Sequence, residues 1–148
     1  MSNYKKLSPE ELKKTLSPLE YAVTQHEDTE PPFNNKYWDN HADGIYVDLV
    51  TGEPLFTSKD KFDSGTGWPC FSAPISKSTL VFKEDKKLWS TRTEVRSKLG
   101  DAHLGHIFDD GPGPEGVRYC INSASLKFIP KGELKNSAYS EWLKIFDV

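Results

Sequence analysis

The chain of 148 residues lacks the features that mark membrane and nucleic-acid-binding proteins. No apolar run approaches the roughly 20 residues that span a bilayer, and the start, MSNYKKLSPEELKK, has no apolar stretch typical of a signal peptide. The formal net charge is -3, so there is no basic excess to bind a phosphate backbone. These absences predict a cytoplasmic protein that binds neither membrane nor nucleic acid.

Cysteine is scarce, with only Cys70 and Cys120 in the chain. Structural disulfides are rare in the reducing cytoplasm. Each cysteine is therefore expected to be a thiol with a chemical role or a buried apolar filler. The remaining composition is globular, with 36% hydrophobic and 12% aromatic residues. A chain of this length is typical of one domain, here residues 1–148.

Short helices are predicted at both ends of the chain. Ser8 and Ser17 are each followed by proline and, three residues on, by glutamate, which is the signature of a capped helix start. The segment 28–33, DTEPPF, ends helical structure because proline removes a donor and restrains the preceding residue. The final stretch, NSAYSEWLKIFDV, predicts a last helix with Ser137 as a possible cap.

Between these ends the pattern is typical of β-structure. GIYVDLVTGEPLF contains two apolar runs joined around Thr51 and Gly52, which predicts a hairpin. STLVFKEDKKLWSTRTEVRS predicts a strand, a charged turn and a longer strand. AHLGHIF and GVRYCINSASLKFI flank DDGPGPEG, a loop too rich in glycine and proline to be regular. We therefore predict a mainly β, antiparallel domain with helices at its ends.

The predicted strand VRYCINS carries a candidate nucleophile. Because side chains alternate along a strand, Arg118, Cys120 and Asn122 share one face. Tyr119 and Ile121 share the other, which faces a core. Arg118 would stabilise the thiolate and so lower the pKa of Cys120. Cys120 could instead be an inert buried cysteine, but its polar neighbours favour a functional thiol.

The motif HLGHIF adds His103 and His106. Residues three apart on a regular strand face opposite sides, so both imidazoles face one site only if the chain kinks, which Gly105 allows. Otherwise one histidine lies in the core and one on the surface. The groups that could converge are His103, His106, Asp109, Asp110, Arg118 and Cys120. Such a set suits nucleophilic cysteine chemistry with acid assistance.

The loop GTGWPCF, residues 65–71, holds Trp68 between Gly67 and Pro69. A large aromatic residue in a loop is either an anchor in the core, which is the commoner arrangement, or a platform for a substrate. Beside the polar groups above, Trp68 would supply an apolar wall.

These stretches together resemble the methionine-R-sulfoxide reductase family. The resemblance extends from about Leu19 to Phe128 and rests on TEPPF, GIYVDLVTGEPLF, GTGWP, RTEVRS and HLGHIFDDGPGPEGVRYCINS, in the family's order. It implies a fold of two packed antiparallel β-sheets with helices at the edges. It also implies reduction of the R epimer of methionine sulfoxide, free or in proteins, without a cofactor.

The resemblance further implies roles for individual residues. Cys120 matches the catalytic cysteine, whose thiolate attacks the sulfoxide sulfur and becomes a sulfenic acid. Three residues match positions that orient or protonate the sulfoxide oxygen: His103, His106 and Asp110. Three others match positions that contact the substrate or surround the nucleophile: Trp68, Arg118 and Asn122. A thiol donor, normally thioredoxin, then restores the cysteine, and we expect a monomer.

The chain departs from the family pattern at the zinc positions. Many members bind a structural zinc ion through two Cys-x-x-Cys pairs. The matching positions here are Asp48 and Thr51, then Ser97 and Gly100. Because no thiolates are present at these positions, we expect no metal.

A second departure concerns Cys70. Members with an internal resolving cysteine usually carry it two residues before the tryptophan, where this chain has Thr66. Cys70, where serine is common, is either a possible resolving cysteine that reaches Cys120 after a loop movement or a buried structural residue. Pro69 stiffens the loop and the aromatic neighbours favour inward packing. The sequence therefore favours the structural role, with Cys120 reduced directly by an external thiol.

Two other functions would use parts of the same pattern. A thiol peroxidase also cycles through a sulfenic acid, but it would need no pocket for a methyl group. A β-type binding module could use exposed aromatic side chains, and replacement of Cys120 would then leave its function intact.

Overall fold

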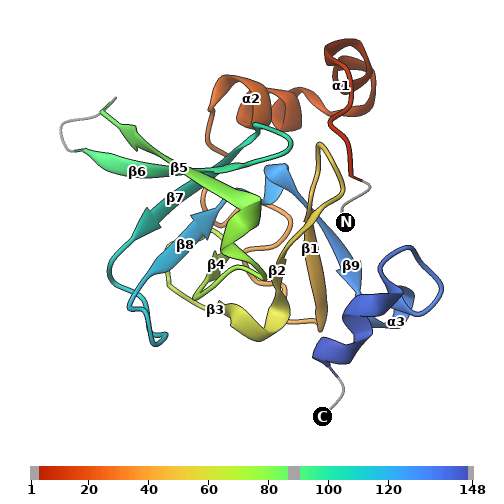
Figure 1. The fold of residues 1–148 in the computed structure, drawn as a ribbon. Helices are drawn as coiled ribbons and strands as arrows, with labels where there is room; N and C mark the ends of the chain where they lie inside the picture. Colours follow the sequence, from red (N-terminus) through yellow and green to blue (C-terminus); the bar gives the residue numbers. More distant parts are fainter. Residues whose placement is uncertain (1–3, 87–90, 147–148) are drawn as a thin grey trace.

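The computed structural model describes residues 4–86 and 91–146 (Figure 1). Its helices are α1 (Pro9–Thr15), α2 (Pro18–His26) and α3 (Lys131–Leu134), with 3-10 helices η1 (Ser58–Asp60), η2 (Lys77–Thr79), η3 (Ser123–Ser125) and η4 (Ser140–Ile145). Its strands are β1 (Gly44–Asp48), β2 (Pro54–Thr57), β3 (Lys61–Phe62), β4 (Cys70–Phe71), β5 (Leu80–Asp85), β6 (Arg92–Ser97), β7 (His103–Phe108), β8 (Arg118–Ile121) and β9 (Leu126–Pro130).

Within these residues the strands form two antiparallel sheets. The smaller sheet has the order β2-β1-β9, and the larger has the order β3-β4-β8-β7-β6-β5. In Figure 1, α1 and α2 lie above the sheets and α3 lies beside the lower end of β9. The predicted fold class, two antiparallel sheets with short helices near the ends of the chain, is confirmed.

Aromatic side chains fill the space between the two sheets. The rings of Phe56 on β2 and Phe71 on β4 stack with their centroids 4.4 Å apart. Tyr46 on β1 meets Phe71 edge-on at 5.2 Å. All three residues are fully buried. These contacts hold β4, a strand of only two residues, against the smaller sheet and so fix the position of Cys70.

Local signals in the sequence correctly predicted several element boundaries. Ser8 and Ser17 cap α1 and α2, and both capping boxes are formed. The β1–β2 hairpin turns at Gly52, whose φ of 82° is easily adopted only by glycine. Residues 109–116 form an irregular loop. β5 and β6 are equally long, six residues each, and part of the charged turn between them lies outside the described residues.

The predicted C-terminal helix over NSAYSEWLKIFDV is confirmed only in part, because it is a 3-10 helix over Ser140–Ile145 that Ser137 does not cap. The segment contains η4, and the short helix α3 precedes it. Ser137 caps neither helix. Its hydroxyl donates to the Leu134 carbonyl at 3.0 Å and accepts from the Tyr139 amide at 3.1 Å, which closes a turn between them. Packing of Trp142 and its neighbours on the smaller sheet decides the path of this segment instead of helix propensity.

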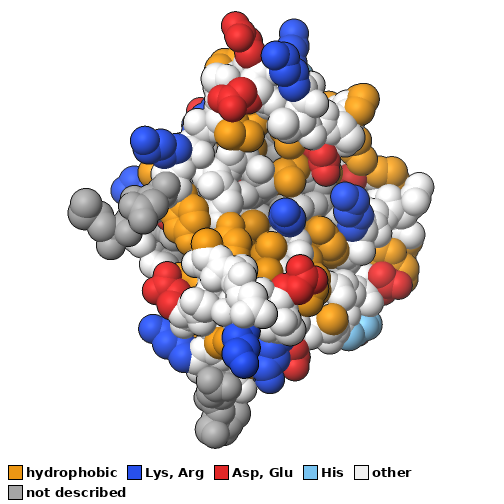
Figure 2. Space-filling model, turned by 90° about the vertical axis from the view of Figure 1, so that its right-hand side faces the viewer, with side chains coloured by type: hydrophobic (Ala, Val, Ile, Leu, Met, Phe, Trp, Pro, Cys, Tyr) orange, Lys and Arg blue, Asp and Glu red, His pale blue; other side chains and the backbone are white. Residues whose placement is uncertain are grey.

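Figure 2 shows the face that carries the C-terminal segment. Hydrophobic side chains gather near its centre, and acidic and basic side chains are interspersed around them. This face therefore offers no patch of a single charge to a polyanion. Among the described residues, no helix is long and apolar enough to cross a membrane.

Candidate active site

The two histidines of β7 face the same side of the larger sheet because the strand contains a bulge. On β6, the adjacent residues Val95 and Arg96 pair with Gly105 and His103, so β7 has one extra residue between them. The His103 and His106 ring centroids are consequently only 5.6 Å apart. A Cβ atom at Gly105 would lie 2.0 Å from a backbone carbonyl oxygen of β8, so only glycine fits there. The predicted kink is confirmed.

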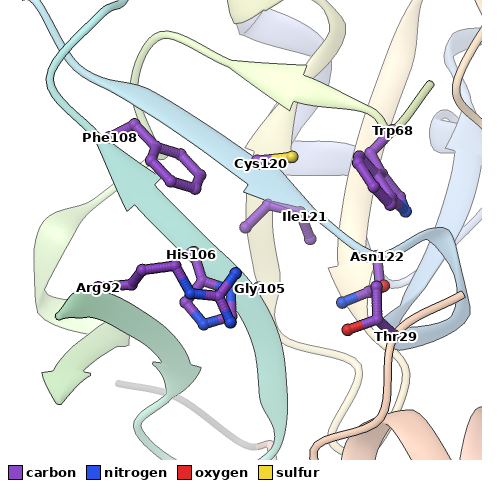
Figure 3. Close-up of a pocket in the computed structure, with 9 residues that line it drawn as sticks. All are labelled: Thr29, Trp68, Arg92, Gly105, His106, Phe108, Cys120, Ile121 and Asn122. Carbon is purple, nitrogen blue, oxygen red and sulfur yellow. The ribbon is translucent and has the colours of Figure 1, made fainter. Parts of the chain in front are cut away.

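A small pocket of about 90 Å³ opens over β7 and β8 (Figure 3). Its lining residues are Thr29, Trp68, Arg92, Gly105, His106, Phe108, Cys120, Ile121 and Asn122. In Figure 3 the Cys120 sulfur points toward the Trp68 side of the pocket, and the side chains of His106 and Arg92 lie together at the other side. Four of the candidate residues from the sequence thus line one pocket: Trp68, His106, Cys120 and Asn122.

The segment around Glu30 holds Trp68 and Asn122 in place. The Trp68 indole Nε1 donates to the Glu30 carbonyl at 3.0 Å. The Asn122 side-chain oxygen accepts from the Glu30 amide at 3.1 Å, and its Nδ2 donates to the Leu104 carbonyl at 3.0 Å. The Glu30 carboxylate is buried, which raises its pKa, and it accepts from backbone amides at the start of η3. Thr29 of the DTEPPF segment lines the pocket, and Glu30 beside it positions Trp68 and Asn122.

His103 lies behind the pocket instead of lining it. Its Nδ1 is 2.6 Å from Oε2 of Glu94 on β6, and the same oxygen accepts from Arg96 Nη1 at 2.7 Å. Burial lowers the pKa of His103, although Glu94 opposes this effect. The His103 Nε2 atom is buried and has no hydrogen-bond partner within residues 4–86 and 91–146.

His106, in contrast, reaches the pocket directly. Its Nε2 lies 2.8 Å from Asp85 Oδ2 on β5, and the same oxygen is 3.5 Å from Arg92 Nη2. Sequence reasoning missed Glu94, Asp85 and Arg92, because their role depends on the pairing of β5, β6 and β7. The charged residues spaced along the KEDKKLWSTRTEVRS stretch were the one signal for them in the sequence.

Asp110 and Arg118 lie beside the pocket and do not line it. The Arg118 Nε donates to the Asp110 carboxylate at 2.9 Å, and this pairing lowers the pKa of Asp110. The Asp110 side chain is 62% exposed. The Arg118 guanidinium lies over the ring of Phe108, with 4.4 Å to the ring centroid.

The two cysteines are free thiols that share a hydrogen bond. The Cys120 thiol donates to the Cys70 sulfur, which lowers the pKa of Cys70 to about 6 and raises the pKa of Cys120. Arg118 does act to lower the pKa of Cys120, as predicted, but Cys70 and burial outweigh it, so the expected net lowering is wrong for the resting pair. Arg118 Nη1 is 4.0 Å from the Cys70 sulfur, and the thiolate of Cys70 outweighs its effect on Cys120.

The four positions that match the zinc ligands of the family do converge. A Cβ atom at Gly100 would lie 2.7 Å from Asp48 Oδ2 and 2.8 Å from Ser97 Oγ, with Thr51 next to them. These residues do not fit zinc, because structural zinc sites use thiolate and imidazole ligands. Within the described part of the chain, no group of three or more His, Cys, Asp or Glu side chains could hold a metal ion.

Two neighbouring thiols lie on paired strands of the larger sheet, and one of them lines a pocket with tryptophan and histidine, an arrangement that suits cysteine chemistry. A family model of the SelR domain matches residues 16–130. The chain is 54% identical over 143 residues to the peptide methionine sulfoxide reductase MsrA/MsrB of Vibrio cholerae serotype O1 (strain ATCC 39315 / El Tor Inaba N16961). That match covers 97% of this chain and only 38% of the relative's length. The chain belongs to the SelR family, the methionine-R-sulfoxide reductase family that its motifs resemble.

Proposed function

We propose that this chain reduces the R epimer of methionine sulfoxide, free or in proteins, with Cys120 as the nucleophile. The observation that carries the proposal is the pocket that Cys120 and Trp68 line together. An apolar ring beside a sulfur atom suits a methyl group bound next to the nucleophile. The name of the relative from Vibrio cholerae supports the same substrate class.

In the proposed reaction, the Cys120 sulfur attacks the sulfoxide sulfur and the oxygen passes to cysteine. The thiol and the sulfoxide give a Cys120 sulfenic acid and methionine, so the substrate sulfur gains the two electrons that Cys120 loses. The hydrogen bond between the two thiols supports deprotonation of the Cys120 thiol, because Cys70 can accept its proton as Cys120 attacks.

A sulfoxide oxygen must receive a hydrogen bond or a proton as the sulfur is attacked. His106 lines the pocket and is proposed to interact with that oxygen directly or through a water molecule. His103 is proposed to act from behind it, held by Glu94. Asp110 is proposed to act through Arg118, its ion-pair partner.

The sulfenic acid must be reduced before the next turnover. We propose thioredoxin or a similar dithiol as the donor. Two free cysteines are compatible with a reducing compartment, which supports the expected cytoplasmic location. We propose that the chain acts as a monomer.

The test is an assay on separated R and S epimers of methionine sulfoxide with dithiothreitol as reductant. The wild type is expected to reduce only the R epimer. Cys120→Ser is expected to lose this activity while keeping the same unfolding midpoint in urea. Reduction of both epimers alike, retained turnover in Cys120→Ser, or faster consumption of hydrogen peroxide than of either epimer would each contradict the proposal.

A further inference from the structure

Cys70 and Cys120 are direct neighbours on paired strands. The register of β4 and β8 places Cys70 opposite Cys120 and Phe71 opposite Tyr119. The Ile121 amide donates to the Pro69 carbonyl at 3.0 Å, so the hydrogen-bonded positions flank the cysteines. Cys70 and Cys120 are therefore a non-hydrogen-bonded pair, for which the Cα atoms lie about 4.5 Å apart and the side chains are closest.

This arrangement meets the geometric requirement for a disulfide. Disulfides generally join residues whose Cα atoms are about 4.4–6.8 Å apart, and the strand pair alone brings the cysteines into that range. No loop has to move, which removes the objection that Pro69 stiffens the approach. Packing of Phe71 against Phe56 and Tyr46 keeps β4 fixed in this register.

The surroundings of the Cys70 sulfur are those of a reactive thiol instead of an apolar filler. Cys70 is fully buried, yet polar groups converge on its sulfur. Ser64 Oγ donates to it at 3.1 Å, the Thr66 hydroxyl is 3.7 Å away and Arg118 Nη1 is 4.0 Å away. Together with the Cys120 thiol these groups favour the thiolate, which is the form that attacks an oxidised sulfur.

We propose that Cys70 is the resolving cysteine of this chain and forms a cross-strand disulfide with Cys120 in every catalytic cycle. This inference rests on the proposed function, which supplies the oxidant. The Cys70 sulfur attacks the Cys120 sulfenic acid, the S–O bond breaks, and the hydroxyl leaves as water with the proton of the Cys70 thiol. The two thiols thereby lose two electrons in all, and one molecule of sulfoxide gains them.

Access decides which sulfur the external reductant attacks. The Cys120 sulfur lines the pocket, whereas Cys70 is buried beneath the loop that carries Ser64, Thr66 and Trp68. An incoming thiolate therefore attacks Cys120 and expels Cys70. The donors around Cys70 stabilise it as the leaving thiolate, and a thiol of lower pKa leaves faster.

The experiment is a single turnover with one equivalent of methionine-R-sulfoxide and no reductant, followed by alkylation and mass spectrometry. The wild type is expected to release one methionine, lose both free thiols and become lighter by two hydrogens. Cys70→Ser is expected to release one methionine and retain a Cys120 sulfenic acid that dimedone traps. Cys120→Ser is the matched control and should show neither product nor disulfide.

Steady-state turnover with thioredoxin is the second measurement. Cys70→Ser is expected to lose at least about ten-fold in this assay, because the sulfenic acid must react without a resolving thiol. A wild type that accumulates sulfenic acid with Cys70 still alkylatable would overturn the proposal. Unchanged thioredoxin-supported turnover in Cys70→Ser would do so as well. If that variant does not fold, the thiol count of the wild type decides alone.

Hydrogen peroxide separates this inference from the proposed function. It oxidises an accessible thiolate to a sulfenic acid without using the substrate pocket. If peroxide produces the disulfide joining Cys70 and Cys120 while neither epimer of the sulfoxide is reduced, the proposed substrate is wrong. The proposal that Cys70 resolves the Cys120 sulfenic acid is then still supported. If methionine is released but no disulfide forms with either oxidant, the proposed reductase function is supported and the resolving role of Cys70 is refuted.

Discussion

Replacing Asp48 tests what holds together the turns that bind zinc in other members of the family. The residue is only 1% exposed. Its carboxylate accepts from the Val50 amide at 2.9 Å, from the Thr51 hydroxyl at 3.2 Å and from Ser97. Ser97 belongs to β6, so the Asp48 carboxylate connects the β1–β2 turn to the β6–β7 turn. We expect Asp48→Ala to destabilise the domain without changing its fold.

The size of the expected loss in unfolding free energy follows from the hydrogen bonds that Asp48→Ala removes. A buried donor left without an acceptor costs about 1–3 kcal/mol. Asp48→Ala leaves the Val50 amide and two hydroxyls without this acceptor, but it also removes the cost of burying a charge, and the hydroxyls can turn toward other groups. We therefore expect a loss of about 3 kcal/mol, or a melting temperature lower by roughly 6–12 °C for a chain of this size.

Urea unfolding of matched variants measures this loss. Asp48→Asn keeps the shape and one acceptor oxygen and should lose less than about 1 kcal/mol at neutral pH. Asp43→Ala, at an exposed position, should stay within about 0.5 kcal/mol of the wild type. Elemental analysis should find no zinc. Equal losses in Asp48→Ala and Asp43→Ala would refute the assigned role, and equal losses in Asp48→Ala and Asp48→Asn would refute the hydrogen-bond argument.

The pH dependence of stability gives an independent check. Burial raises the folded-state pKa of Asp48 above its ordinary value of 3.8, so the folded chain binds this proton more tightly than the unfolded chain. The contribution of the site to the unfolding free energy is therefore complete below pH 3.8 and is lost as the pH rises through the folded-state pKa. Relative to Asp48→Asn, the wild type should gain stability as the pH falls from 7. A parallel profile for the two proteins would contradict this.

Three further substitutions, the first with a matched control, test the site. Gly105→Ala should force β7 and β8 apart and cost about 1–3 kcal/mol in urea unfolding, whereas Gly132→Ala, where an added methyl group would meet no atom within 4 Å, should not destabilise the chain. Glu94→Gln should lower the imidazole pKa of His103 further, as measured by NMR titration, because the carboxylate opposes the effect of burial. Trp68→Ala should raise KM for the R epimer by roughly 10–100-fold, and an unchanged KM would remove Trp68 from the substrate pocket.

Local patterns predicted those features that depend on neighbouring residues. Proline and glutamate after Ser8 and Ser17 identify capped helices, and Gly52 identifies a hairpin. A kink in β7 was also predictable from Gly105 between His103 and His106, although the extra residue of the bulge is Leu104 and Gly105 itself allows the close approach of β8. In each case a backbone restriction imposed by one residue type decides the local geometry.

Pairings between distant segments could not be predicted in this way. Cys70 and Cys120 are 50 positions apart, and a short stretch such as CF carries no signal for its register. The contact depends on aromatic packing between the two sheets around Phe71. The same reason applies to Glu94, which reaches His103 only through the pairing of β6 with β7.

The position of the thiol pair also predicts the sequence in which the two substrates bind and methionine is released. Cys120 lines the pocket and Cys70 is fully buried, so the sulfoxide and the reducing dithiol must approach the same sulfur through the same opening. They cannot occupy it together. In the proposed mechanism methionine therefore leaves before thioredoxin attacks, and the proposed disulfide holds the oxidising equivalents between the two events. Initial rates measured against sulfoxide at several thioredoxin concentrations should give parallel double-reciprocal lines, the pattern of a ping-pong mechanism. Intersecting lines would show that both substrates bind at once, which this arrangement of the two sulfurs does not permit.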